Sequence, residues 1–157
     1  MAEIPKNFMD LAYRLCGQTY GISVTSTKAE HPFDERNIHP KISNATKTLF
    51  DNGHYIHATF EACKVIEKLV KKKSKINKIG FPLMMEAFNE KEAKIKLNQM
   101  TTQPKEDEQS GFKHIFAGLM SGVRNPRAHD SWPESIDECL DNLSLASLLL
   151  RKIDNAP

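Results

Sequence analysis

The chain has 157 residues, of which 39% are hydrophobic, and this suits one domain whose core needs no disulfide or metal to hold it. Its 22 basic residues nearly balance 20 acidic ones, and the net charge of +2 excludes a histone-like polybasic protein. Three widely spaced cysteines, Cys16, Cys63 and Cys139, argue against a disulfide scaffold or a zinc knuckle. We therefore expect reduced thiols and a cytoplasmic protein.

No segment of the sequence has the character of a membrane span. The longest uncharged run, from Leu15 to Thr27, is well short of the roughly twenty apolar residues that a spanning helix needs. The first residues lack the basic start and the apolar stretch of a signal peptide. We expect a chain that does not cross a membrane.

Apolar residues recur at helical spacing along most of the chain. Residues 1–32 are expected to form an N-terminal helix and an extended arm, with Tyr20 to Thr27 able to pair as a short strand. Residues 33–157 are expected to form a helical domain, with a loop up to Asn37 and an irregular polar segment over 90–109. Helices are predicted from Pro40 to Asn52, from Tyr55 to Lys73, from Phe81 to Phe88, from Gly111 to Val123, and from a capping box at Ser131 to Ile153.

These segments predict an all-α bundle of about five to six helices, with at most a short two-stranded β element. In the helix from Tyr55, Phe60 belongs to an apolar stripe that is expected to face the core. The last helix is apolar over a wide arc, which indicates burial on more than one side. We expect this breadth, together with Gly111, Gly118 and Gly122 on the preceding helix, to support a homodimer.

The segment from Arg124 to Asp130 carries the most chemistry, and it is expected to form a turn between two helices, held by Pro126. An arginine offers a permanently charged fork for a phosphate, and a histidine such as His129 can move protons. This pairing suits cleavage of RNA without a metal, because the ribose 2′-OH can attack the adjacent phosphorus once a base removes its proton. The spacing alone is weak evidence, and the alternative is that Arg124 and Arg127 cap helices and pair with Asp130.

The segment Arg124-Asn125-Pro126-Arg127-Ala128-His129 resembles the Arg-x(4–6)-His motif of HEPN domains. The wider pattern is similar to the prophage-associated Ymh-type subfamily over residues 33–153, and it comprises His39-Pro40-x-Ile42, Asp51-Asn52-Gly53-His54-Tyr55, Gly111-Phe112 and Phe116-Ala117-Gly118. The resemblance implies a helical bundle that dimerises and places both chains' motifs in one cleft. It implies that Arg124 binds phosphate and stabilises the transition state, that His129 is the acid/base, and that Asn125 orients one of them. Glu67 and Lys71 fit a further Glu-x-x-x-Lys feature of some HEPN domains.

Lysines recur along one face of the helix from Tyr55, and a continued helix would align them as an RNA-binding track, to which we add Arg127. The track comprises Lys64, Lys68, Lys71 and Lys75, with Lys78 beyond it. The alternative is an ordinary solvated helix face. His54 and His57 lie three residues apart but have no acidic or thiol companion at fixed spacing, so we expect neither a metal site nor a cofactor.

Two functions remain open on the sequence. The first is a metal-independent endoribonuclease that acts as a toxin or an anti-phage defence effector, with RNA as its substrate and a neutralising antitoxin or defence partner. The second is a non-catalytic HEPN-like module that binds a partner protein or a nucleotide through the same surface. A solvent cleft lined by arginine and histidine would favour the first, and buried pairing of Arg124 with an acidic side chain would favour the second.

Overall fold

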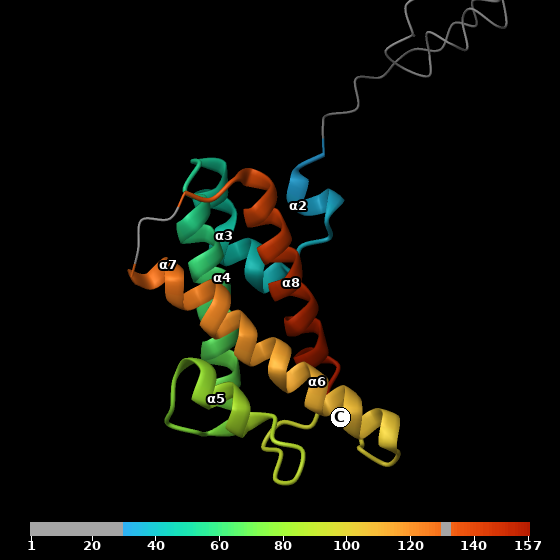
Figure 1. Cartoon of the computed structure of the whole chain (residues 1–157). Helices are drawn as coiled ribbons and strands as arrows, with labels where there is room; N and C mark the ends of the chain where they lie inside the picture. The colour runs from blue at the N-terminus through green and yellow to red at the C-terminus, as the bar shows by residue number, and fades with distance from the viewer. Residues whose placement is uncertain (1–29, 130–132) are drawn as a thin grey trace, which may run out of the picture. The chain divides into compact units, whose positions relative to one another are not determined.

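The computed structural model describes residues 30–129 and 133–157, and residues 31–157 form one compact unit. The predicted all-α bundle is confirmed, and the described residues contain no strand (Figure 1). The expected arm from Tyr20 to Thr27 lies outside the described residues, as do Cys16, Asp130, Ser131 and Trp132. No helix in the described part of the chain is long and apolar enough to cross a membrane.

The helices follow one another in a simple order along the chain. They are α2 (Pro32–Glu35), α3 (Pro40–Asp51), α4 (Tyr55–Ser74), α5 (Gly80–Ala87), α6 (Gln103–Gly118), the π-helix η1 (Leu119–Arg124), α7 (Asn125–His129) and α8 (Ile136–Asp154).

Two histidine–proline pairs begin the first two helices. The Nδ1 atoms of His31 and His39 accept the backbone N–H groups of Phe33 and Lys41, each at 3.1 Å, and thereby satisfy donors that a helix start leaves free. The proline after each histidine suits the first helical position. The short helix α2 therefore replaces part of the loop expected up to Asn37.

Helix α4 is central to the bundle and contacts α3, α5, α8 and η1 (Figure 1). Its fully buried side chains include Ile66 and Val70, which belong to a single core with α5, α6 and α8. On the α5–α6 side, the rings of Phe88 and Phe116 stack with 4.2 Å between centroids. The predicted amphipathic pattern of α4 is thus confirmed for most of its length.

Helix α6 begins at Gln103, earlier than the predicted Gly111, so the expectation of an irregular segment up to Gln109 is wrong there. Pro104 sits in the first turn and Glu106 carries the negative charge that a helix N-terminus favours. Gln109 is fully buried, and its amide donates to the carbonyls of Phe88 and Ile95 and accepts from the N–H of Leu97. A polar side chain in the core therefore ties the preceding loop to α6, and hydrophobic spacing gives no sign of it.

The motif segment is helical, and the turn expected at Arg124 is wrong for the described residues up to His129. Helix α6 widens into η1, where the N–H of Asn125 bonds the carbonyl of Met120, five residues back. Pro126 follows immediately, and a proline inside an α-helix lacks an N–H and crowds the carbonyl four residues earlier. The wider π turn accommodates the proline without ending the helix.

Helix α8 begins at Ile136 rather than at the predicted capping box of Ser131. Ser135 is the actual cap, and its Oγ accepts the N–H of Glu138 at 3.1 Å. Glu134 precedes the helix.

An ion pair fastens the loop after α5 to α6. The Nζ of Lys113 lies 2.6 Å from Oε2 of Glu90, and the Oγ of Ser110 donates to the same carboxylate at 3.0 Å. The hydrogen bond from Lys113 lowers the pKa of Glu90 to about 2, from an ordinary value near 4.5. The lysine side chain is only 9% exposed, so its charge depends on this partner.

We predict that the Glu90–Lys113 pair makes stability depend on pH in acid. A carboxylate whose pKa is lowered on folding stabilises the protein above its unfolded pKa, and this contribution disappears as pH falls from about 4.5 to about 2. In urea unfolding, Glu90→Gln should lower the free energy of unfolding at pH 7. On acidification, the free energy of unfolding of this variant should fall less than that of the parent protein. Glu92→Gln, on an exposed side chain of the same loop, is the matched control, and equal acid sensitivity of all three would contradict the prediction.

Candidate functional site

Arg124 is the last residue of η1, and its side chain is 21% exposed. Its Nη1 donates to Oδ1 of Asn125 at 3.2 Å, and its Cζ lies 5.4 Å from the ring centroid of Phe60. Nη2 lies 3.7 Å from Oε2 of Glu67, which is close enough for charge attraction but outside hydrogen-bond distance. Nε is buried and has no hydrogen-bond partner among the described residues. The guanidinium is thus only partly satisfied.

Glu67 links this arginine to α5. Its Oε1 accepts the N–H of Gly80, the first residue of α5, while Oε2 faces Arg124. Gly80 has a φ of +60°, a left-handed conformation that glycine adopts without strain. The structure therefore brings together Arg124 and the glutamate of the Glu-x-x-x-Lys pattern.

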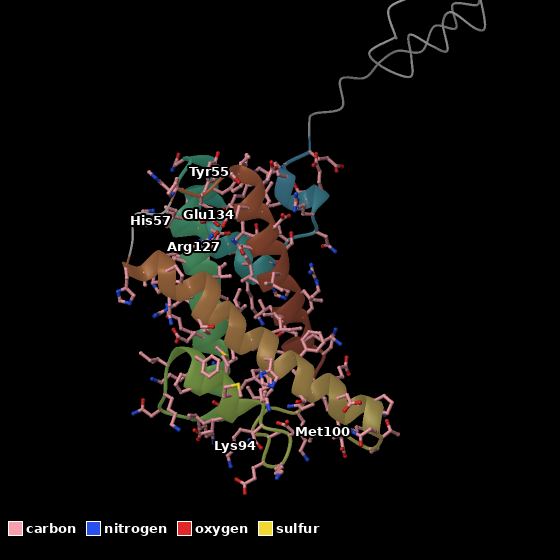
Figure 2. The ribbon with its side chains drawn as sticks, viewed as in Figure 1. Tyr55, His57, Lys94, Met100, Arg127 and Glu134 are labelled. Carbon is pink, nitrogen blue, oxygen red and sulfur yellow. The ribbon has the colours of Figure 1, made fainter. Side chains whose placement is uncertain are left out.

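Arg127 has a different environment three residues later. Its Nε and Nη2 donate to the two oxygens of Glu134 at 2.9 and 3.0 Å, Nη2 also donates to Glu138, and Nη1 donates to the carbonyl of Val123 (Figure 2). The side chains of Arg127 and Glu134 are 6% and 0% exposed. Burial disfavours the charged guanidinium, but the bonds to Glu134 and Glu138 outweigh it and raise the pKa of Arg127.

The carboxylate of Glu134 joins three helices. Besides Arg127 it accepts hydrogen bonds from Thr59 of α4 and from Asn142 of α8, each at 2.9 Å. Arginine pairing was anticipated with Asp130, which lies outside the described residues, and the described partners of Arg127 are Glu134 and Glu138. Every nitrogen of Arg127 is engaged, so a contact of Arg127 with RNA stays a prediction.

His129 and Asn125 complete the motif on α7. His129 is the last residue of α7 and is exposed, and the structure assigns its ring no hydrogen bond with the described residues. Asn125 contacts Arg124 directly, which suits the orienting role that the motif implies for it. Arg124 and His129 occupy one continuous helical stretch, and no hydrogen bond joins their side chains in this chain.

The lysine track is shorter than a continued helix would make it. Helix α4 ends at Ser74, and Lys75 is its C-cap with a φ of +59°, so Lys75 and Lys78 leave the helical face. Lys64 lies 2.5 Å from Glu61 and 5.4 Å from the ring centroid of Phe60. Lys68 is exposed and Lys71 half-buried, and the described residues provide neither with an ion-pair partner. Three lysines therefore remain aligned on α4.

Phe60 was expected in the core and is instead at its edge. It is half-buried and belongs neither to the buried core nor to the partly buried hydrophobic side chains that pack against that core in the described residues. Two cations, Lys64 and Arg124, lie over its ring. The only sequence signal for this is Lys64 at i+4 on the same helix face.

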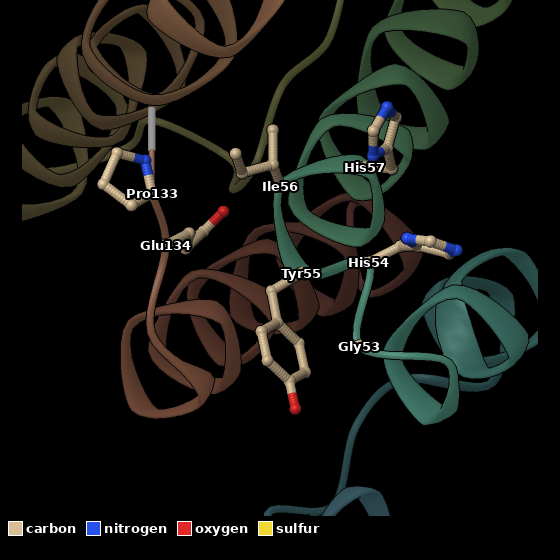
Figure 3. A pocket seen from close by; sticks show the side chains of 7 residues that line it. All are labelled: Gly53, His54, Tyr55, Ile56, His57, Pro133 and Glu134. Atoms are coloured by element: carbon tan, nitrogen blue, oxygen red, sulfur yellow. The ribbon is translucent and has the colours of Figure 1, made fainter. Parts of the chain in front are cut away.

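A shallow hollow of about 320 Å³ lies at the start of α4, lined by Gly53, His54, Tyr55, Ile56, His57, Pro133 and Glu134. In Figure 3 the rings of His54 and His57 lie together on one side of it, and Pro133 and Glu134 lie on the other. The described residues include no group of three or more histidine, cysteine or acidic side chains placed to hold a metal. The hollow therefore offers no ligand set for a metal ion within that part of the chain.

The two described cysteines are buried in the core. Burial raises the pKa of the Cys63 thiol to about 12 and that of Cys139 to about 11. Neither of these two cysteines of the described part of the chain supplies a thiolate at neutral pH.

We predict that the two motif arginines contribute very differently to stability. Arg127→Met leaves the Glu134 carboxylate buried without its cation and should cost about 3–5 kcal/mol in urea unfolding. Arg124→Met should cost less, because Nη2 lies 3.7 Å from Glu67, beyond hydrogen-bond distance, and Glu67 keeps its hydrogen bond from the N–H of Gly80. Adding Glu134→Gln to Arg127→Met should recover part of the loss, because the buried charge is then absent. Equal losses at both arginines would contradict the assignment.

Comparison with known proteins identifies the family of this chain. No curated protein and no solved structure matches the chain significantly. A family model described as a protein of unknown function, Hypoth_Ymh, matches residues 36–153, a range that runs from just after α2 almost to the end of α8 and includes the whole motif. The chain belongs to the Hypoth_Ymh family.

Proposed function

We propose that this protein is a metal-independent endoribonuclease of the HEPN type, acting as a toxin or an anti-phage defence effector in the cytoplasm. One observation carries the proposal. Arg124 is a half-buried arginine with an unpartnered Nε among the described residues, on the same helical stretch as the exposed imidazole of His129. A guanidinium with free donors suits a phosphate, and an exposed imidazole suits proton transfer.

The proposed reaction is an internal transesterification of RNA. The imidazole of His129 removes the proton from the ribose 2′-OH, whose oxygen then attacks the adjacent phosphorus. Arg124 stabilises the added negative charge of the phosphorane, and Asn125 holds one nitrogen of that guanidinium. The bond from phosphorus to the 5′ oxygen breaks, that oxygen takes up a proton, and a 2′,3′-cyclic phosphate remains.

The proposal includes a homodimer that combines two copies of the motif in one cleft. Gly111, Gly118 and Gly122 are exposed on α6 and η1, and a Cβ at any of them would meet nothing within 4 Å. Ile115, four residues after Gly111, is 42% exposed. These residues recur at helical spacing on one exposed face, which would let a second copy's backbone approach closely.

The RNA backbone would follow the face of α4. Lys64, Lys68 and Lys71 remain aligned there, beside Phe60 and Arg124. Lys75 lies just past the helix end and would extend the track in a different direction. We assign Arg127 a supporting role, since its contact with RNA would require it to release the buried carboxylate of Glu134. A toxin of this kind would also require a neutralising antitoxin or defence partner.

A second function is favoured by one specific contact. The approach of Glu67 to Arg124 is the acidic pairing expected of a non-catalytic module that binds a partner protein or a nucleotide. We prefer the catalytic function because the 3.7 Å separation is no hydrogen bond, so Nη2 of Arg124 has only a weak hold on Glu67 that an anion could replace. RNA cleavage by the purified protein separates the two.

We predict that the purified protein cleaves single-stranded regions of mixed RNA in EDTA and leaves 2′,3′-cyclic phosphate ends. His129→Ala should lose about 10²- to 10⁴-fold in rate, because proton transfer is removed. Arg124→Ala should lose about 10²- to 10³-fold, because the phosphorane charge loses its partner. The rates are measured by gel analysis of labelled RNA, with end groups identified by mass spectrometry.

Two matched variants control this experiment. Arg36→Ala removes an arginine that pairs with Asp141 on another part of the surface, and His57→Ala removes an exposed histidine of α4. Both should retain the parental rate. Activity that disappears with EDTA and returns with a metal would refute the mechanism, and so would full activity in His129→Ala.

We predict that the protein sediments as a dimer at micromolar concentration, at about twice its monomer mass of 17.8 kDa. Gly118→Gln should shift it to a monomer, because the larger side chain projects from the glycine surface. The substitution has room within the monomer and replaces a helical glycine, so the fold should gain up to about 1 kcal/mol in stability. A monomeric parent protein would remove the shared cleft from the proposal.

A further inference from the structure

Phe60 occupies an unusual position for a phenylalanine. It lies on the central helix α4 and is half-buried, yet it takes no part in the core cluster of the described residues. Two cations approach its ring instead, Arg124 and Lys64, each with 5.4 Å between the charged group and the ring centroid. This distance falls within the range of cation–π attraction.

The ring attracts Arg124 without using any of its N–H donors. A carboxylate partner holds an arginine by accepting those donors, as Glu134 does with Arg127 at 2.9 and 3.0 Å. An aromatic face attracts the same charge through its quadrupole and leaves the N–H groups at the edge of the guanidinium free. The described contacts of Arg124 fit this difference, since Nε has no partner and Nη2 is beyond hydrogen-bond distance from Glu67.

We propose that Phe60 is a positioning residue that holds the guanidinium of Arg124 so that its terminal Nη groups can meet a phosphodiester. Lys64 lies at the same ring and is paired with Glu61. This inference rests on the proposed function for the identity of the anion, and it adds a residue that the Arg-x(4–6)-His motif does not contain.

The test follows the Nε–H signal of Arg124 by NMR in the full-length ¹⁵N-labelled protein, assigned by its absence in Arg124→Lys. Inorganic phosphate and a 2′-O-methyl single-stranded RNA, which cannot be cleaved, are the two probes. Both should shift this signal in the parent protein. Phe60→Leu should weaken both affinities about 3- to 30-fold, as expected for loss of a partly exposed cation–π contact. Phe60→Trp should restore them, because the aromatic face returns.

Two controls separate positioning from a general structural effect. Phe81→Leu makes the same substitution at a phenylalanine of α5 that is 44% exposed, and should leave both affinities unchanged. In an Arg124→Gln background, where affinity is followed by the backbone amide signals of α4 and α7, Phe60→Leu should cause no further loss, because the two residues act together.

Three results would overturn the inference. They are an unshifted Arg124 signal in the parent protein, unchanged affinity in Phe60→Leu, and an equal loss when Arg124 is already replaced. Failure of the proposed function gives a different pattern. Phosphate and RNA binding would then depend on Phe60 while the parent protein leaves ordinary RNA intact, and the inference on Phe60 would stand.

Discussion

The buried pair of Arg127 and Glu134 is the interaction on which the arrangement of the motif depends. It joins the end of the long helical stretch α6–η1–α7 to the start of α8, and through Thr59 to α4. A carboxylate with no exposed surface is unfavourable without a cation, so Glu134 requires Arg127 and Arg127 requires Glu134. The pair holds α7 against the bundle through the side chain of Arg127, which is only 6% exposed.

With α7 held in this way, the π-helix determines what Arg124 contacts. Pro126 is incompatible with regular α-helical bonding, and the wider turn of η1 absorbs it. Arg124 is the last residue of that turn and lies beside Phe60 and Glu67. Arg127 lies three residues later, in α7, and pairs with Glu134. The two arginines of one segment thus have different surroundings: Arg127 is fully hydrogen-bonded to buried partners, and Arg124 is only partly satisfied.

Much of the fold could be predicted, because apolar spacing is a local property that survives folding. The helical class, the central helix from Tyr55 and the last helix to Ile153 follow from it. Apolar spacing does not reveal bonds between distant segments. Gln109 joins α6 to the loop before it, and Glu134 accepts from Arg127, Thr59 and Asn142. The start of α8 is itself local, because Ser135 accepts the N–H of Glu138.

The helical class and the residues of the Arg-x4-His segment can be recognised from the sequence alone. The packed helices show that this segment continues a helix, that Arg127 is fully hydrogen-bonded and that Arg124 lies beside Phe60 and is only partly satisfied. The sequence specifies the type of every side chain. Whether a polar side chain is buried and hydrogen-bonded depends instead on which partner the packed helices bring within about 3 Å. An arginine's role therefore follows from its neighbours in space rather than from its neighbours in sequence.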